Sequence, residues 1–511
     1  MKLFNRIYKT AVLCAATAII LPAQTFTTLF NFGGTNGATP AAALVQGTDG
    51  YLYGTTMEGG IDGEAGPCGL YEVGCGTIFK ITPDGTLTTL YSFCAYSQCP
   101  DGAYPNAALV QTANGDFYGI TTGGGSSSYC TSLYYYVLGC GTIFKMTPSG
   151  LLTTIYNFCS QVACADGEQP IAGLVQGAGG ALYGTTSSGG ANNAGTIFKI
   201  TPDGNLTTLY SFCALSGCAD GQDPIGALVQ AANGEFYGTT FEGGSSTYCA
   251  SVNPFGYGCG TVFRITPSGT FTTLYSFCAQ SGCADGFSPY AGLLQASNGR
   301  FYGTTALGGV PACGLGCGTV FKITSSGALT TLYSFTGGDD GGSPYSGVIQ
   351  ASGGNLYGTT TGTVSPTIFE ITPAGSLTVL SEIPVPPDFS GGYYPALVQD
   401  TNGDLYGTTP LGADLNFCFG GCGTIYSLSA GLGPFIKLQP TSGAVGALVD
   451  ILGSDLSGAT GVSFNGTPAI FKVVSNSLIQ ANVPAGATTG RVQVTTPGGT
   501  LVSDVNFRER P

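Results

Sequence analysis

The chain has 511 residues, of which 43% are apolar and only 8% are charged, and it contains 85 glycines and 28 prolines. This apolar content is enough to bury a large core and excludes a disordered protein, while many turn residues between aromatic segments are typical of an all-β fold. The formal net charge of −14 repels phosphate groups, which argues against nucleic acid and anionic membrane surfaces as partners.

Residues 1–24 have the pattern of an export signal. Lys2, Arg6 and Lys9 precede an apolar stretch at residues 11–21. The alternative is a membrane anchor, but this stretch is too short to cross roughly 30 Å of hydrocarbon. We therefore expect a secreted protein, extracellular or held at the cell surface, with no membrane insertion.

A short motif of the type Tyr-Gly-Thr-Thr recurs through most of the remaining chain. Each copy follows an apolar run such as residues 108–111 and precedes two further segments such as residues 76–82 and 87–93. The turns between these segments, such as residues 82–85, have hairpin chemistry, because proline fixes φ and glycine accepts a positive φ. The pattern predicts four strands in each of seven units, whose motifs begin at Tyr53, Tyr118, Tyr183, Tyr237, Tyr302, Tyr357 and Tyr406.

The two ends of the repeat indicate how the units are arranged. Residues 25–32 look like a fourth strand without the first three, and residues 423–426 like a third strand without a fourth. A linear β-solenoid is the alternative, but the two deficits cancel only in a closed ring. The sequence therefore predicts a seven-bladed β-propeller at residues 25–430, closed by the N-terminal strand. We also expect the glycine of each motif to let neighbouring blades approach closely.

These repeats resemble the GloVer tandem-repeat family of exported bacterial proteins, over roughly residues 25–430. The resemblance implies β-propeller-like repeats, and it carries no catalytic residues over to this chain. Residues 434–511 differ in composition, with no cysteine and with turn segments such as 440–443, 462–466 and 483–486. This part resembles an IPT/TIG domain, and its short strands independently suggest a small immunoglobulin-like β-sandwich that acts as a spacer or docking module.

The cysteines fall into close pairs. Cys14 lies in the export signal, which leaves 18 of the 19. The chain has no histidine, so the common Cys/His zinc sites are excluded, and local pairing in an exported protein favours disulfides over a metal site. We expect no metal, no cofactor and nine disulfides, which join Cys68 and Cys75, Cys94 and Cys99, Cys130 and Cys140, Cys159 and Cys164, Cys213 and Cys218, Cys249 and Cys259, Cys278 and Cys283, Cys313 and Cys317, and Cys418 and Cys422.

Recurrent Asp-Gly pairs precede the first strand of successive units. In one interpretation they form a ring of carboxylates that binds cations or sugar hydroxyls, and in the other each aspartate caps its own turn. The carboxylates of residues 400–404 resemble part of a calcium-binding loop. The equivalent turns of other units lack this acidic pattern, so a hairpin turn is the favoured interpretation. The candidate ligand-binding carboxylates are Asp101, Asp166, Asp220, Asp285 and Asp340.

All long loops and all cysteine pairs fall in the connections from second to third strand and from fourth strand to the next unit. Because strands alternate in direction, these connections emerge on one face, which we expect to bind the ligand. Aromatic residues in the longest loops either stack on a ligand or pack on their own loop. The candidates are Tyr129, Tyr134, Tyr135, Tyr136, Tyr248, Phe255 and Tyr257.

Without histidine, the chain cannot form a Ser-His-Asp or Cys-His catalytic arrangement. The sequence favours a non-catalytic binding module that recognises polysaccharide or extracellular protein through the looped face. The alternative is a carbohydrate-active hydrolase or lyase that uses paired carboxylates on the same face. An assembly scaffold without a small ligand is a third possibility.

Overall fold

The computed structural model describes residues 24–510, except 61–67, 69–73, 95–97, 128, 131–132, 135–136, 178, 250–257, 363–364, 385–394, 413–417 and 419–420. The expected export signal lies outside the described residues. Within them, no helix has the length and apolar character needed to cross a membrane.

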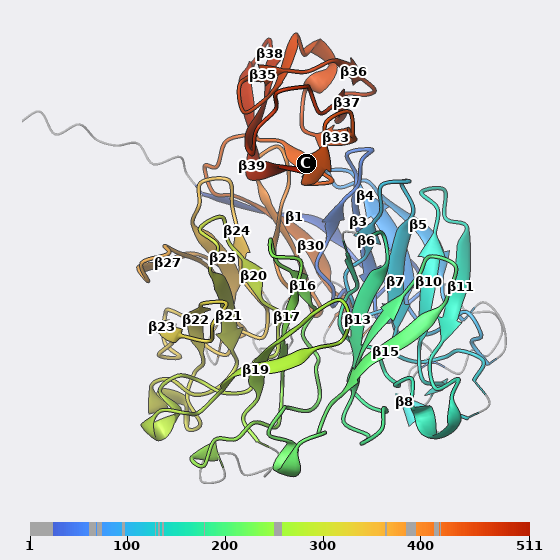
Figure 1. Ribbon diagram of the computed structural model, residues 1–511, viewed down its shortest axis with the longest axis vertical. Coiled ribbons are helices and arrows are strands. Elements are labelled where there is room, and N and C mark those ends of the chain that lie inside the picture. The colour runs from blue at the N-terminus through green and yellow to red at the C-terminus, as the bar shows by residue number, and fades with distance from the viewer. Residues whose placement is uncertain are drawn as a thin grey trace, which may run out of the picture.

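The described residues between Thr25 and Ser429 form seven four-stranded antiparallel sheets, one for each unit of the repeat (Figure 1). Unit 1 holds β2 (Val45–Gln46), β3 (Leu52–Thr56), β4 (Thr77–Ile81) and β5 (Leu87–Ser92). Unit 2 holds β6 (Val110–Gln111), β7 (Phe117–Thr121), β10 (Thr142–Met146) and β11 (Leu152–Asn157), with a small hairpin of β8 (Leu133–Tyr134) and β9 (Val137–Leu138) in its long loop. Unit 3 holds β12 (Val175–Gln176), β13 (Leu182–Thr186), β14 (Thr196–Ile200) and β15 (Leu206–Ser211).

The other units repeat this order. Unit 4 holds β16 (Val229–Gln230), β17 (Phe236–Thr240), β18 (Thr261–Ile265) and β19 (Phe271–Ser276), and unit 5 holds β20 (Leu294–Gln295), β21 (Phe301–Thr305), β22 (Thr319–Ile323) and β23 (Leu329–Ser334). Unit 6 holds β24 (Ile349–Gln350), β25 (Leu356–Thr359), β26 (Thr367–Ile371) and β27 (Leu377–Glu382). Unit 7 holds β28 (Val398–Gln399), β29 (Leu405–Thr409) and β30 (Thr424–Ser429), and its fourth strand is β1 (Thr25–Asn31).

The N-terminal strand closes the ring of sheets. β1 pairs antiparallel with β30, so Thr25 lies opposite Ser429 and Asn31 opposite Thr424. Next to this pairing, the Thr408 hydroxyl of unit 7 donates a hydrogen bond to the Pro40 carbonyl of unit 1 at 3.0 Å. This closure gives a propeller-like arrangement and excludes the linear β-solenoid.

Aromatic contacts join successive sheets around the ring. At six of the seven junctions, a phenylalanine after the fourth strand packs on the third-strand phenylalanine of the next unit. Phe93 of unit 1 and Phe144 of unit 2, for example, have ring centroids 5.3 Å apart. The same contact runs from Phe32 to Phe79, from Phe158 to Phe198, from Phe212 to Phe263, from Phe277 to Phe321 and from Phe335 to Phe369.

The glycine of the repeated motif has a different role from the one the sequence predicts. A Cβ atom on Gly54 would lie 2.5 Å from the Phe79 ring and 2.7 Å from Leu44, and both residues belong to the same unit. The glycine therefore makes room for the third-strand phenylalanine of its own sheet. The tyrosine before it makes the contact between units, because the Tyr53 ring lies 4.1 Å from that of Phe117 in unit 2.

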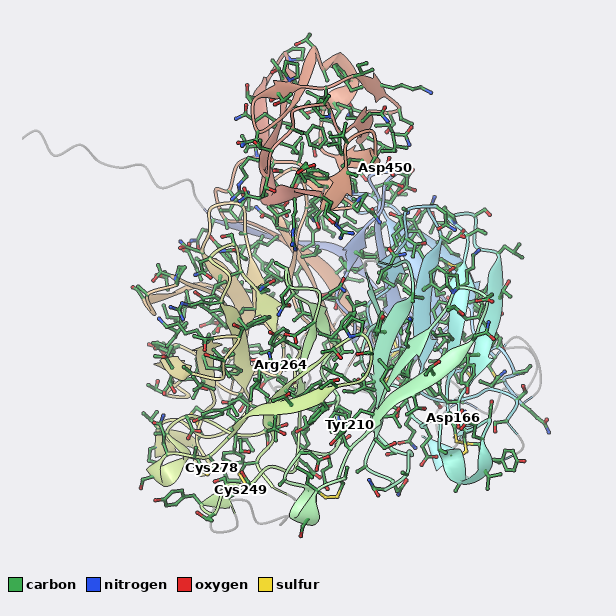
Figure 2. All side chains as sticks on the ribbon, in the orientation of Figure 1. Asp166, Tyr210, Cys249, Arg264, Cys278 and Asp450 are labelled. Atoms are coloured by element: carbon green, nitrogen blue, oxygen red, sulfur yellow. A yellow bond between two sulfur atoms is a disulfide. The ribbon has the colours of Figure 1, made fainter. Side chains whose placement is uncertain are left out.

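The connections divide the ring into two faces, which we name for what they carry. The disulfide face bears the loops from second to third strand and from fourth strand to the next unit, including the short 3-10 helices η1 (Val162–Cys164), η2 (Ser216–Cys218), η3 (Ser281–Cys283) and η4 (Pro311–Cys313). The turn face bears the tight turns between first and second and between third and fourth strands. Figure 2 shows Cys249, Cys278 and Asp166 at the end of the ring away from Asp450 of the C-terminal domain.

The C-terminal domain is a two-sheet sandwich above the turn face (Figure 1). One sheet contains β31 (Lys437–Gln439), β33 (Leu448–Leu452), β37 (Leu478–Asn482) and β36 (Phe471–Val473). The other contains β32 (Ser442–Ala444), β39 (Gly499–Arg510), β38 (Gly490–Thr496), β34 (Gly461–Phe464) and β35 (Thr467–Pro468), and η5 (Leu456–Gly458) lies between β33 and β34. Apolar side chains of both sheets, including Ile451, Phe464, Val494 and Phe507, form its core.

Candidate functional site: the disulfide face

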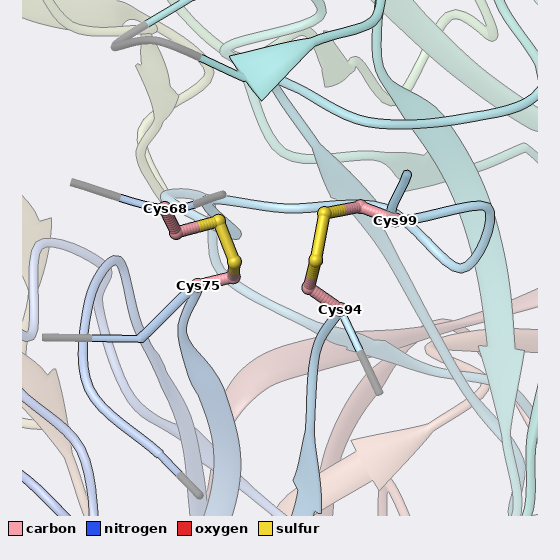
Figure 3. A group of neighbouring side chains, drawn as sticks. All are labelled: Cys68, Cys75, Cys94 and Cys99. Carbon is pink, nitrogen blue, oxygen red and sulfur yellow. A yellow bond between two sulfur atoms is a disulfide. The ribbon is translucent and has the colours of Figure 1, made fainter. Parts of the chain in front are cut away.

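Nine disulfides hold the loops of the disulfide face, and they join the same nine pairs that the sequence spacing predicts. Some lie next to one another, as Figure 3 shows for the bridges Cys68–Cys75 and Cys94–Cys99. The four sulfur atoms of that group lie within 4.8 Å of one another and are buried. Because each sulfur is already bonded to another, these groups act as double staples at the bases of the loops.

The recurrent aspartates cap their own loops, which corrects the interpretation of a ligand-binding carboxylate ring. Asp220 is fully buried, and its carboxylate accepts hydrogen bonds from the Tyr210 hydroxyl at 2.8 Å and from the backbone amides of Ala214 at 2.9 Å and Leu215 at 3.0 Å. Three donors occupy this carboxylate and leave little of it for a ligand.

The other aspartates repeat this arrangement. Asp166 and Asp285 are also fully buried and accept the equivalent three hydrogen bonds, and Asp340 accepts bonds from the Tyr333 hydroxyl and the Thr336 amide. Asp101 is 7% exposed and accepts a bond from the Tyr91 hydroxyl. These aspartates, the most regular carboxylates of the chain, therefore do not support the hydrolase alternative.

Two of the predicted loop aromatics are exposed in the structure. The side chain of Tyr129 in unit 2 is 51% exposed and that of Tyr248 in unit 4 is 48% exposed. Both precede a disulfide cysteine, Cys130 and Cys249 respectively. Tyr135, Tyr136, Phe255 and Tyr257 lie outside the described residues, and so does the side chain of Tyr134.

The inner strands place a second group of residues at the disulfide-face end of the ring's centre, which the sequence reasoning missed. The Tyr290 ring of unit 5 lies between Phe241 of unit 4, at 5.7 Å, and Tyr345 of unit 6, at 5.3 Å. The Phe241 amide donates a hydrogen bond to the Asp223 carbonyl at 3.0 Å. Tyr290 and Tyr345 occupy equivalent positions ahead of the first strands of units 5 and 6, and this repetition is the sequence signal that could have found them.

Asp223 and Glu242 form a half-buried pair of carboxyl groups beside these rings. Burial, together with the negative charge of Glu242, raises the pKa of Asp223 to about 7. The Gln222 side-chain amide donates a hydrogen bond to Glu242 at 2.8 Å. Asp223 therefore takes up a proton near neutral pH.

The C-terminal domain covers the centre of the turn face through hydrogen bonds to several units. The Gln439 side chain donates to the Gln111 carbonyl at 2.7 Å, and the Ser477 hydroxyl donates to the Thr48 carbonyl at 3.3 Å. The Phe435 amide donates to the Thr401 carbonyl at 3.1 Å. These contacts join the C-terminal domain to units 1, 2 and 7 on the turn face.

A lysine with two acidic neighbours lies at the centre of this interface. Burial lowers the pKa of Lys437, while the charges of Asp400 and Asp504 oppose that shift. Burial likewise raises the pKa of both carboxyl groups, and Lys437 opposes the rise. Asp400 begins a hairpin turn, as its sequence predicts, because the Gly403 amide donates a hydrogen bond to its carbonyl at 2.9 Å. The sequence reasoning gave Lys437 no role.

The contacts on the opposite side of the interface are sparser. Arg508 of β39 donates a hydrogen bond to the Ala232 carbonyl of unit 4. Around it, a cleft of ≈ 980 Å³ lies between the C-terminal domain and the turns of units 4 to 6, lined in part by Gln295, Gln350 and Asp504.

Comparisons with solved structures return chains of low similarity. An aldose sugar dehydrogenase from Streptomyces coelicolor in its PQQ-bound form has a TM-score of 0.38 at 13% identity, covering 80% of this chain and 98% of that one. A putative gluconolactonase has a TM-score of 0.32 at 13% identity, covering 57% and 82%. TolB from Acinetobacter baumannii has a TM-score of 0.36 at 12% identity, covering 68% and 64%. No curated protein matches the sequence.

Family comparison is decisive, because its matches extend over most of the chain. The profile of the IPT/TIG domain matches residues 435–508. The profile of the Gloeobacter/Verrucomicrobia repeat matches residues 17–138, 128–284 and 247–468. The chain belongs to the Gloeobacter/Verrucomicrobia repeat family and carries a C-terminal IPT/TIG domain.

Proposed function

We propose that the protein is a non-catalytic binding module of the cell exterior, a seven-bladed β-propeller that recognises polysaccharide or extracellular protein through its disulfide face. One observation carries this proposal. Among the described residues of the seven units, six of the seven exposed large hydrophobic side chains lie on the disulfide face: Tyr129, Val162, Leu215, Tyr248, Val310 and Leu315. The seventh, Leu151, lies on the turn face.

Exposed apolar side chains gathered on one face mark interaction sites more often than scattered ones do. The disulfides and the expected location support the same assignment. The disulfides fix the loops that carry them, so little conformational entropy is lost on binding. A secreted or surface-exposed location accounts for the number of disulfides, because such bonds persist in oxidising compartments.

A binding array tests this proposal. The oxidised chain from residue 24 onwards is applied to immobilised neutral and acidic polysaccharides from bacteria and plants. We expect saturable binding that is lost in the double variant Val162→Glu/Leu215→Glu and retained in Leu151→Glu, a matched change on the turn face. Circular dichroism checks that all three proteins are folded.

The outcomes separate the faces and the ligand classes. Binding that survives the disulfide-face variant but not Leu151→Glu would assign the turn face instead. Absence of binding to every polysaccharide of the array would exclude these polysaccharides as the ligand. Shortening of a bound polymer would contradict the non-catalytic assignment and point to Asp223 and Glu242.

A further inference from the structure

Tyr129 and Tyr248 are held by two loops of the same construction. Residues 122–141 of unit 2 and 241–260 of unit 4 connect the second and third strands with equal length. The bridges Cys130–Cys140 and Cys249–Cys259 have the same sequence separation of 10, with Cα–Cα distances of 5.8 and 5.7 Å. The two loops therefore share their length, their bridge and the place of the exposed tyrosine.

Each loop is also tied to a second disulfide of its own unit. The Ser127 hydroxyl donates a hydrogen bond to the Cys159 carbonyl, and the Ser246 hydroxyl donates to the Cys278 carbonyl. Cys159 and Cys278 belong to the bridges Cys159–Cys164 and Cys278–Cys283. Each tyrosine thus lies between two stapled points, so its position on the face is fixed in the same way in both units.

Unit 3 lies between these two loops, and its own connection is short. Only residues 187–195 join β13 to β14, and they fold back onto the sheet. The Asn192 side chain donates a hydrogen bond to the Phe212 carbonyl at 2.9 Å, and the Gly189 amide donates to the Asn193 side chain at 3.2 Å. The loop between the second and third strands of unit 3 is therefore shorter than the equivalent loops of units 2 and 4.

The surface chemistry of this stretch selects a type of ligand. The described parts of these loops, residues 124–127, 129–130, 189–195 and 243–249, contain no Asp, Glu, Lys or Arg. Loop segments without charge offer no electrostatic attraction to a polyanion or a polycation. Tyrosine presents an apolar ring and a hydroxyl group together, which suits a ligand that is apolar on its ring faces and rich in hydroxyl groups.

We propose that the disulfide face binds an extended, neutral glycan across unit 3, with Tyr129 and Tyr248 as two equivalent contact points. This inference rests on the proposed binding function and names its ligand class. Two copies of one side-chain arrangement, separated by a unit whose own loop is short, match a ligand that repeats its own chemical group along a chain. Engaging both tyrosines makes the second contact intramolecular, which strengthens binding without any new type of contact.

A length series tests this inference. Neutral linear cello-, xylo- and manno-oligosaccharides of increasing length are titrated into the oxidised chain by calorimetry. In at least one series, we expect affinity to rise once the oligosaccharide reaches both tyrosines and then to level off. Tyr129→Ala and Tyr248→Ala should each weaken binding of the long members by about tenfold or more. Either variant should leave the short members within about twofold, because one tyrosine still remains.

Matched variants separate contact from folding. Tyr129→Phe keeps the ring and should retain most of the length effect, and Leu151→Ala on the turn face should change nothing. A length-independent affinity, or a long-chain affinity insensitive to both tyrosine variants, overturns the two-point inference while the proposed binding function stands. Absence of binding to every neutral glycan overturns this inference, and if acidic polysaccharides or a protein still bind, the proposed function survives it.

Discussion

Tyr210 donates a hydrogen bond to the buried carboxylate of Asp220 at 2.8 Å, and this pair connects the fourth strand of unit 3 to the loop that follows it. Burial, followed by the hydrogen bond to Asp220, raises the pKa of Tyr210 well above its usual range. The phenol therefore stays protonated and continues to donate. Equivalent pairs in units 2, 4 and 5 place the same support under the disulfide face.

Asp220→Asn should destabilise the protein without removing a ligand contact. An asparagine side chain has only one acceptor oxygen, so its NH₂ group would face backbone amides that also donate. The expected loss in free energy of unfolding is about 2 kcal/mol, measured by urea denaturation. Glu382→Gln, at an exposed strand end, should change nothing. Unchanged stability in Asp220→Asn would contradict the capping role.

The pKa of Asp223 predicts how stability changes with pH. The folded-state pKa is raised to about 7, so between about pH 4 and pH 7 the folded protein holds a proton that the unfolded chain has lost. The stability that protonated Asp223 contributes is fully present below about pH 4 and is lost as the pH rises from about 4 through 7. Asp223→Asn should therefore raise the melting temperature at pH 8 and have little effect at pH 4. Thermal melts across this range check the sign, and Asp84→Asn on an exposed turn is the control.

Much of the fold can be predicted because the same strand pattern occurs seven times. The strands of each unit follow from the recurring Tyr-Gly motif, and the closure of the ring follows from the incomplete unit at each end. The disulfides follow from cysteines that lie close together in the sequence. Asp220 was harder, because the same Asp-Gly pattern suits a turn cap and a ligand carboxylate, and burial alone separates them. The pair Asp223–Glu242 and the role of Lys437 depend on which segments meet in space, which no local pattern specifies.

The loop disulfides should stabilise the fold and position the exposed tyrosines. Replacing Cys130 and Cys140 with serine opens a loop of eleven residues, and loop-closure entropy predicts a loss of about 3 kcal/mol in stability. The Tyr129 loop should then lose its fixed shape, and affinity for long glycans should fall more than affinity for short ones. The matched control is the pair Cys313 and Cys317 of unit 5, whose removal should lower stability without changing the length effect.

The N-terminal strand should be indispensable for the ring. Deleting residues 24–31 removes β1 and leaves β30 without its antiparallel partner on that side. It also exposes the apolar surface of units 7 and 1 and an unpaired strand edge, which favours aggregation. We expect this variant to be insoluble or to melt well below the parent chain, whereas deleting residues 434–511 should leave a folded ring. Equal melting temperatures for the β1 deletion and the parent would contradict the closure.

Lys437 should hold the IPT/TIG domain on the turn face. Lys437→Met leaves Asp400 and Asp504 without their shared cation, and an uncompensated, largely buried charge pair is expected to cost about 2–4 kcal/mol of stability. Cleavage by a protease in the linker before Phe435 should become faster, because the domain undocks more often. The triple variant Lys437→Met/Asp400→Asn/Asp504→Asn removes the stranded charges and should recover most of the loss. Lys472→Met changes an exposed lysine of the same domain and is the control. If the single and triple variants lose stability equally, the lysine contributes packing and not charge.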